Sequence, residues 1–451
     1  MIVILEKLPT DFIQVCRSRI LEILAKKGFF PSSHQILLAW DPSFTWTKRI
    51  RVFNTTPHLR IPLLLVSLVN LFRSGRRAPG EGARCLDRTA RMGGDGNSFY
   101  FNALILDLRD MARGDEAPAS EEVSLEKDIL NEFESDFLTY PQSLGPVKAW
   151  AYFPSRHHRF QSRKYFLKLL FMLGADAADL DSSSVVMCRL LRSGSSAVPP
   201  MDALELLEDH VFGAGKYGQH ALAIDNGVRE GDGGVLLWVH EKHNELDAGV
   251  NVNILCLLAA LVERVESDLK DRVFILAGNI FRFLDRHRVA EDFSRPDFLM
   301  YYSLEVTLFL WYRFLAYLEA LPLPERGRFD PEGGCIALNR HFIGLMERKW
   351  RASPSSFNAF DKLMVLPLLL REASPVATAM LAESGPLELL NAVSDQACEF
   401  GKFIYPVTLL YGNQAVGIYA AEILAREIRR AGSWGEGSPD VGPETPGNSS
   451  S

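Results

Sequence analysis

The stretch Val235–Glu263 joins a short aromatic and β-branched segment to a long helical pattern with almost no polar side. Val235–Val239 favours an extended segment, and Glu245-Leu-Asp247 places an acid where a helix can start. The helical pattern over Asn251–Val265 is apolar on nearly every side. A helix of this kind cannot face water, so other elements must enclose it, and this requirement strongly constrains the fold.

The same arrangement occurs earlier in the chain. The aromatic segment Ala149–Phe153 precedes Asp179-Leu-Asp181, and the apolar helix pattern Ser182–Leu191 follows directly. Twice, therefore, an acid lies at the N-terminal start of an apolar helix behind an aromatic segment. We expect both helix starts to lie at the same end of the molecule.

Wholly apolar helix patterns alternate with amphipathic ones along the rest of the chain. Two concentric rings of helices satisfy this alternation, because an outer ring shields an apolar inner ring from water. The sequence therefore predicts an all-α fold with roughly six inner and six outer helices, and few or no strands in a sheet. The predicted helices are Asp11–Lys27, Pro62–Phe72, Phe99–Met111, Leu125–Phe137, Tyr165–Leu173, Ser182–Arg192, Ala203–Phe212, Asn251–Val265, Val273–Leu284, Tyr301–Ala320, Ile336–Arg348, Asp361–Leu370, Pro386–Phe400 and Gln414–Arg429.

The chain has 451 residues, a length that commonly corresponds to more than one domain. A closed ring of helices is an exception, since one repeating layer can hold a long chain. We therefore expect a single domain over residues 1–431, in which helices within residues 1–75 complete the ring. Gly432–Ser451 has almost no apolar content, which predicts a disordered tail.

The net charge of −7 argues against general nucleic-acid binding, which requires a basic face. The six cysteines are scattered without a Cys-x-x-Cys pair, and this pattern indicates a reducing compartment. We recognise no secretory signal, and the most apolar runs, Ile61–Phe72 and Leu363–Leu370, are too short to cross a bilayer. These features predict a cytoplasmic protein, and they leave peripheral membrane contact and the oligomeric state open.

The segment His240–Glu245 contains two histidines and two glutamates, but their spacing differs from the His-Glu-x-x-His pattern of zinc sites. We expect a solvated turn there. A Gly-rich phosphate-binding loop is also missing from the sequence. We therefore expect neither a metal site nor a cofactor.

Five short stretches carry a resemblance to a known superfamily. They are Trp150-Ala-Tyr152-Phe153-Pro154, Asp179-Leu-Asp181-Ser182-Ser183, Asp247-Ala-Gly-Val-Asn251-Val-Asn253, Tyr301-Tyr302-Ser303 and Tyr411-Gly412-Asn413. With them, the region from about Gly93 to Arg429 resembles the α/α-toroid superfamily of terpenoid cyclases and protein prenyltransferases. More narrowly, it resembles bacterial proteins of prenyltransferase and squalene-cyclase type that have a single toroid.

The resemblance implies an α/α toroid, which is a double ring of inner and outer helices. It also implies acid-initiated cyclisation or isomerisation of an isoprenoid or other apolar substrate, because class II terpene cyclases use the middle Asp of an Asp-x-Asp-Asp motif as proton donor. By position this role falls on Asp181, with Asp179 as the supporting acid, and Ser182 replaces the last Asp of the motif. The Asp-x-Cys of the zinc-dependent protein prenyltransferases is absent.

We expect the residues that bind an apolar substrate to gather in a cavity at this same end of the ring. They are Trp150, Tyr152, Phe153, Trp238, Asp247, Asn251, Tyr301 and Tyr302. Aromatic side chains stabilise carbocations through cation–π contacts. Asp247 and Asn251 share a helix face because they are four residues apart, whereas Asn253 points elsewhere.

Each candidate residue also has a structural interpretation. The two acids can act only as helix N-caps, the amides can tie loop backbone to their helix, and the aromatic side chains can be core residues. The sequence therefore leaves two functions open: a class II terpene cyclase-like enzyme, or a non-catalytic toroid that binds an apolar ligand or a partner protein in the same cavity. Desolvation raises the pKa of Asp181 whereas the helix N-terminus lowers it. Which of these two effects is larger decides between the enzyme and the binding protein.

Overall fold

The computed structural model describes residues 32–37, 94–96, 98–114, 120–142, 145–151, 178–218, 222–223, 233–239, 243–244, 246–289, 302–395, 399–405, 407–412 and 414–433. Within these residues twelve α-helices dominate, which confirms the prediction of a predominantly helical protein. No helix in this part of the chain combines the length and apolar character needed to cross a membrane.

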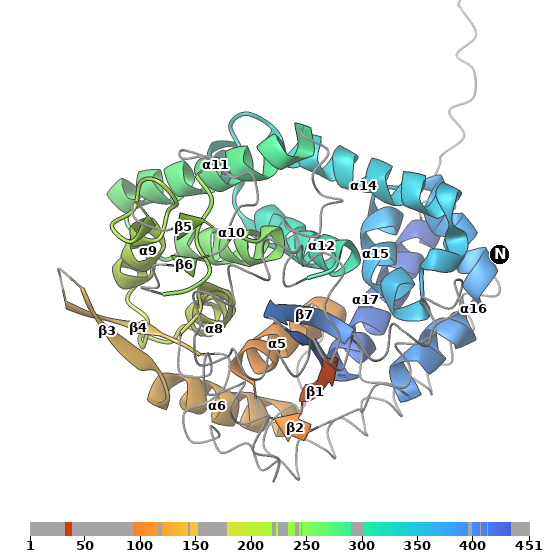
Figure 1. The fold of residues 1–451 in the computed structure, drawn as a ribbon, viewed down its shortest axis with the longest axis horizontal. Coiled ribbons are helices and arrows are strands. Elements are labelled where there is room, and N and C mark those ends of the chain that lie inside the picture. The colour runs from red at the N-terminus through yellow and green to blue at the C-terminus, as the bar shows by residue number, and fades with distance from the viewer. Residues whose placement is uncertain are drawn as a thin grey trace, which may run out of the picture.

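Six helices form a closed ring in the centre of the molecule (Figure 1). They are α5 (Phe99–Arg113), α8 (Leu180–Arg192), α10 (Ala248–Val262), α12 (Leu304–Ala320), α15 (Ala359–Arg371) and α17 (Gln414–Ser433). Each packs against the next, and α17 packs against α5 to close the ring. Helix α10 is buried along its whole length, as its all-round apolar sequence requires.

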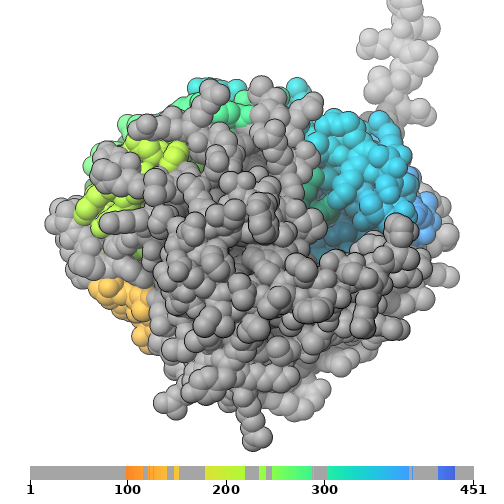
Figure 2. All heavy atoms as spheres, viewed as in Figure 1, coloured from red at the N-terminus to blue at the C-terminus, as the bar shows by residue number. Residues whose placement is uncertain are grey.

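Five longer helices and one short helix lie outside this ring (Figure 1). They are α6 (Ser120–Ser135), α9 (Pro200–Asp209), α11 (Ser267–Val289), α13 (Leu323–Phe329), α14 (Gly334–Ala352) and α16 (Pro375–Asp395). In α14 the buried residues Cys335, Leu338, Phe342, Met346 and Trp350 recur every three or four positions, so one side faces the protein and the other faces water. The segment that contains α14 accordingly forms part of the cyan surface in Figure 2.

The inner helices run parallel, with their N-termini at one end of the ring. Near the starts of their helices, Tyr100 stacks on Tyr302 and Asn253 bonds to Asp181. Near the other end, Arg426 of α17 donates to the carbonyl of Met111 in α5. The side chains that cap these starts, each by accepting a backbone N–H three residues later, are Ser98, Asp179, Asp247, Ser303 and Asn358.

A four-stranded antiparallel sheet lies at the same end of the ring. Its order is β2 (Gly94–Gly96), β1 (Ser32–Leu37), β8 (Val407–Gly412) and β7 (Glu399–Tyr405). Strand β2 leads into α5 and β8 leads into α17, which places the sheet where those helices begin (Figure 1). Strands are a minor part of the described residues, as expected, but four of them pair in one sheet that the sequence analysis did not identify.

The predicted helix Pro386–Phe400 is also wrong at both ends, because α16 begins at Pro375 and β7 already starts at Glu399. Aromatic and β-branched residues crowd both β7 and β8, and this composition favours strands. A second hairpin that the sequence analysis missed pairs β3 (Leu138–Gln142) with β4 (Gly145–Ala149). A short parallel pair joins β5 (Leu222–Ala223) to β6 (His243–Asn244).

Several predictions concern residues that the structure does not describe. These are the helices Asp11–Lys27, Pro62–Phe72 and Tyr165–Leu173, the contribution of residues 1–75 to the ring apart from β1, and the tail beyond Ser433. Helix α17 extends to Ser433, so the proposed tail boundary at Gly432 falls inside a helix.

Candidate functional site

The two aromatic segments meet at the start of α8. The N–H of Asp179 donates to the carbonyl of Trp150 (3.2 Å), and the N–H of Leu180 donates to the carbonyl of Leu237 (2.7 Å). Asp179 also lies opposite Trp238 in an antiparallel bridge. Residues 149–151 and 233–239, far apart in the sequence, thus both contact the start of the same inner helix.

Trp150 acts as an anchor between α6 and α8. Its backbone N–H donates to the Ser183 hydroxyl (2.9 Å), and its indole N–H donates to the carbonyl of Phe133 in α6 (3.0 Å). The side chain is completely buried and packs near Phe137. Its contacts are those of a core residue that joins an outer helix to an inner one.

Asp179, Asp247 and Asn251 have their polar atoms engaged by backbone groups. The Asp179 carboxylate accepts from the N–H of Ser182 (2.5 Å) and caps α8. The Asp247 carboxylate caps α10 in the same way. The Asn251 amide accepts from the N–H of Val235 (2.9 Å) and donates to its carbonyl (3.1 Å), so it ties residues 233–239 to α10.

Asp181 is placed differently from these capping groups. It lies in the first turn of α8, and its side chain points toward groups on other helices. Its Oδ1 accepts from Asn253 Nδ2 (2.8 Å), and its Oδ2 accepts from the Tyr302 hydroxyl. Tyr302 is completely buried and stacks on Tyr100 with ring centroids 6.2 Å apart.

This geometry corrects the assignment of the amides on α10. The sequence analysis directed Asn251 toward the acids and Asn253 elsewhere, but Asn253 is the residue that contacts Asp181. Its Nδ2 also donates to the Tyr100 hydroxyl (3.3 Å). The helix face shared by Asp247 and Asn251 instead meets residues 233–239.

Burial controls the acidity of both acids at the start of α8. It raises the pKa of Asp181, the neighbouring Asp179 raises it further, and hydrogen bonds from Tyr302 and Asn253 only partly oppose this, so the pKa is about 8. Burial also raises the pKa of Asp179, to about 7, against the backbone bonds of its capping role. Desolvation therefore outweighs the capping bonds at Asp179 and the side-chain hydrogen bonds at Asp181.

A buried ion pair lies deeper in the ring, next to Asn253. Arg313 of α12 is fully buried, and its Nη1 donates to Asn253 Oδ1 (2.8 Å). Its Nε and Nη2 donate to Asp107 Oδ2 of α5 (3.1 and 2.5 Å), which also accepts from the Tyr317 hydroxyl (2.6 Å). Burial alone would raise the pKa of Asp107, but the surrounding guanidinium groups hold it below its usual value.

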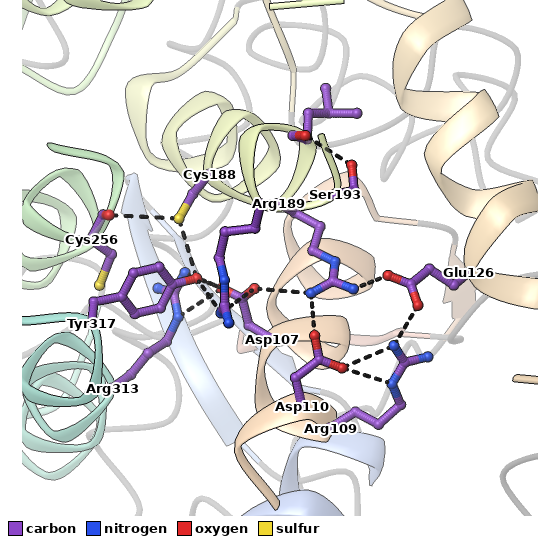
Figure 3. Close-up of polar contacts among 12 residues, drawn as sticks. Asp107, Arg109, Asp110, Glu126, Cys188, Arg189, Ser193, Cys256, Arg313 and Tyr317 are labelled. Carbon is purple, nitrogen blue, oxygen red and sulfur yellow. Dashed lines mark hydrogen bonds and ion pairs between the residues drawn. The ribbon is translucent and has the colours of Figure 1, made fainter. Parts of the chain in front are cut away.

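Further charged groups extend this network toward the C-terminal ends of α5 and α8 (Figure 3). Arg189 pairs with Asp110 (2.5 Å) and with Glu126 of α6, and its Nη1 lies 3.7 Å from Asp107 Oδ1. Arg109 pairs with the same Asp110 and Glu126. The interior of the ring is thus crossed by a chain of polar contacts that begins at Asp181.

Sequence reasoning missed Asn253, Tyr100, Arg313 and Asp107 as partners of the acid. One signal for them is present: Asp107 and Arg313 are charged residues that each interrupt an apolar run inside a helix pattern, Ala103–Leu108 in one case and Leu308–Leu318 in the other. An enclosed helix cannot turn such a charge to water, so each requires a buried partner.

Three of the predicted binding residues, Tyr152, Phe153 and Tyr301, lie outside the described residues, as do His240 and Glu241. Among the residues that the structure does describe, no three His, Cys, Asp or Glu side chains are placed to hold a metal ion together. Neither a protein-family model, nor a curated protein, nor a solved structure matches this chain.

Proposed function

We propose that the ring is a single α/α toroid and that Asp181 is the acid of a class II terpene cyclase-like reaction on an isoprenoid or other apolar substrate. The observation that carries the proposal is the placement of Asp181, which is buried in the first turn of an inner helix with its carboxyl held between Asn253 and Tyr302. With a pKa of about 8, its carboxyl is predominantly protonated at pH 7. A general acid must hold its proton at working pH and release it only in the reaction.

The partners of Asp181 suit the charge that develops when the proton leaves. The O–H proton is transferred to a carbon–carbon double bond, whose π electrons form the new C–H bond, while the O–H electrons stay on the carboxylate. Asn253 and the Tyr302 hydroxyl are both positioned to donate to that carboxylate. The rearranged carbocation then loses a proton, which returns to the Asp181 carboxylate directly or through water, so that the acid is restored and a cyclisation or isomerisation is completed without a cofactor.

Asp179 supports this role through its position. It caps α8 two residues before Asp181, and its proximity raises the pKa of Asp181. Ser182, which stands where the cyclase motif has its last acid, donates its backbone N–H to Asp179. The capping function therefore belongs to the first acid and leaves the second one directed into the ring.

A different observation favours a non-catalytic toroid. Both oxygens of Asp181 are already hydrogen-bonded within the chain, and Asn253 connects them to the Arg313–Asp107 pair. A polar network that satisfies itself in this way also serves to specify a unique core. Under this alternative the same end of the ring binds an apolar ligand or a partner protein without turnover.

Incubation with a panel of polyprenyl substrates, with products read by mass spectrometry, separates the two functions. For an enzyme, we expect a product that is an isomer of its substrate and that disappears with Asp181→Asn, because the amide keeps the shape but has no acidic proton. Asp268→Asn, the same change at an exposed position in the first turn of α11, is the matched control and should retain the product. Ligand binding without any product, unchanged in Asp181→Asn, supports the binding protein instead.

A further inference from the structure

The hydrogen-bonding capacity of Arg313 determines how the Asn253 side chain must be oriented. A guanidinium group has only donors, so the atom of Asn253 that faces Arg313 Nη1 at 2.8 Å has to be the carbonyl oxygen Oδ1. The opposite orientation would place two donors face to face beside a completely buried cation. Arg313 cannot turn away, because its Nε and Nη2 are held by Asp107 Oδ2.

This orientation has a consequence for Asp181. With Oδ1 turned to Arg313, the amide nitrogen of Asn253 faces Asp181 Oδ1 at 2.8 Å, and an NH₂ group can only donate. Asp181 Oδ1 must therefore accept in both protonation states of the carboxyl. A neutral carboxyl has one O–H, which is then placed on Oδ2. There it donates to the Tyr302 oxygen, the reverse of the bond that the ionised carboxylate accepts from the Tyr302 hydroxyl.

We propose that Arg313 is a positioning residue that locks the Asn253 amide and thereby confines the acidic proton of Asp181 to Oδ2. The relay runs from Asp107 on α5 through Arg313 on α12 and Asn253 on α10 to Asp181 on α8, so it needs four of the six inner helices. This inference rests on the proposed function only for the chemical role of the Asp181 proton. The orientation itself follows from the donors and acceptors.

Other ionisable groups also face Asp181, and the test must separate them from Arg313. They are Asp179 at the start of α8, Asp247 at the start of α10, Tyr100 on α5 and Tyr302 before α12. Arg313 differs from them in its geometry, because its Nη1 donates to the Asn253 carbonyl oxygen at 2.8 Å.

The first experiment measures the titration midpoint of Asp181 by carboxyl ¹³C NMR in Arg313→Lys, using Asp181→Asn to assign the signal. Lysine keeps the charge beside Asp107, but its single ammonium lacks the planar fork that also holds Asn253. The freed amide no longer supplies a fixed donor to the carboxylate, so we expect the midpoint to rise by about one to two pH units. A folded Arg313→Lys protein with the midpoint of the parent overturns the proposal.

Arg189→Lys is the matched control. Arg189 also lies beside Asp107, at 3.7 Å, but within the described residues it pairs with acids and not with Asn253. We expect the titration midpoint of Asp181 in Arg189→Lys to equal that of the parent. An equal rise of this midpoint in Arg189→Lys and Arg313→Lys would assign it to a change of charge near Asp107 instead of the orientation of the Asn253 amide.

A measurement on the unaltered protein covers the case in which Arg313→Lys does not fold. With asparagine-selective ¹⁵N labelling, the Asn253 NH₂ signal, assigned by its loss in Asn253→Asp, should shift with the same midpoint as the Asp181 carboxyl. An Asn253 NH₂ signal whose chemical shift does not change as Asp181 titrates would refute the proposed orientation. Neither experiment uses a substrate, so a failure to turn over isoprenoids removes the proposed function and leaves this inference standing.

Discussion

Replacing Asp181 with asparagine should make the protein more stable at neutral and alkaline pH. The pKa of Asp181 is about 8 in the folded protein, against 3.8 for an ordinary aspartate, so folding is linked to proton uptake between these values. The contribution of this group to stability is fully present below pH 3.8 and is lost as the pH rises through about 8. A difference of about four pKa units corresponds to about 5 to 6 kcal/mol.

The asparagine side chain of the Asp181→Asn variant cannot ionise, and it keeps the hydrogen-bonding pattern. Its Oδ1 can accept from Asn253, and its NH₂ can donate to the Tyr302 oxygen, so little is lost at low pH. We expect the free energy of unfolding of Asp181→Asn to exceed that of the parent by several kcal/mol at pH 8 and by about 1 to 2 kcal/mol at pH 5.

Urea unfolding at pH 5, 6, 7 and 8, followed by circular dichroism, measures this difference directly. Between pH 5 and 7, the parent should lose about 1.4 kcal/mol per pH unit more than the variant. The control Asp268→Asn lies on the exposed first turn of α11 and should follow the parent curve. Parallel curves for the parent and Asp181→Asn would refute the claim that Asp181 is held in its neutral form.

Three further changes test other contacts. Asp107→Asn leaves the buried guanidinium of α12 without its counter-charge and should lower the free energy of unfolding by about 3 to 5 kcal/mol in urea titrations. Asn251→Leu removes the side-chain hydrogen bonds to the buried N–H and carbonyl of Val235, and it should lower the free energy of unfolding by about 2 to 4 kcal/mol. In Gly249→Ala the new Cβ would lie 2.3 Å from Tyr302 Cδ2, so the Tyr302 side chain must move away from Asp181. The titration midpoint of Asp181 in carboxyl NMR should then rise, because the Tyr302 hydrogen bond lowers its pKa. An unchanged midpoint would show that the Tyr302 side chain stays in place.

The helical content and the location of the acids could be predicted from local sequence. Asp247 and Asp179 are recognisable as caps because each precedes an apolar helix and can accept a backbone N–H. The apolar character of α10 on all sides required its enclosure, and the structure buries every residue of it. The repeat predicted that the starts of α8 and α10 lie at the same end, but it did not predict that both aromatic segments meet at the start of α8.

The partners of Asp181 could not be predicted because they depend on how four helices are rotated against one another. On α10, both Asn251 and Asn253 are buried, and only the position of α8 decides which of them faces the acid. Local spacing says which residues share a face but not which neighbour that face meets. Strand β8 was missed for a related reason, since it pairs with β1, which is distant in sequence, and β7 joins the sheet only through β8.

Closure of the ring between α5 and α17 has a consequence for synthesis of the protein. Arg426 meets a carbonyl 315 residues earlier in the chain, and β8 pairs with β1 across a similar span. On the ribosome, α5, α8, α10, α12 and α15 can associate in the order in which they emerge, because each packs on the one before it. The sides of α5 and α15 that contact α17 have no such partner until α17 itself has been made.

Contacts of such long separation form slowly, since the entropy of closing the intervening loop opposes them before any favourable contact is gained. A nascent chain that stops before α17 therefore exposes two apolar flanks at the open ends of an arc. We expect such a chain to be prone to aggregation, because the final step of folding requires the last helix of the ring to leave the exit tunnel.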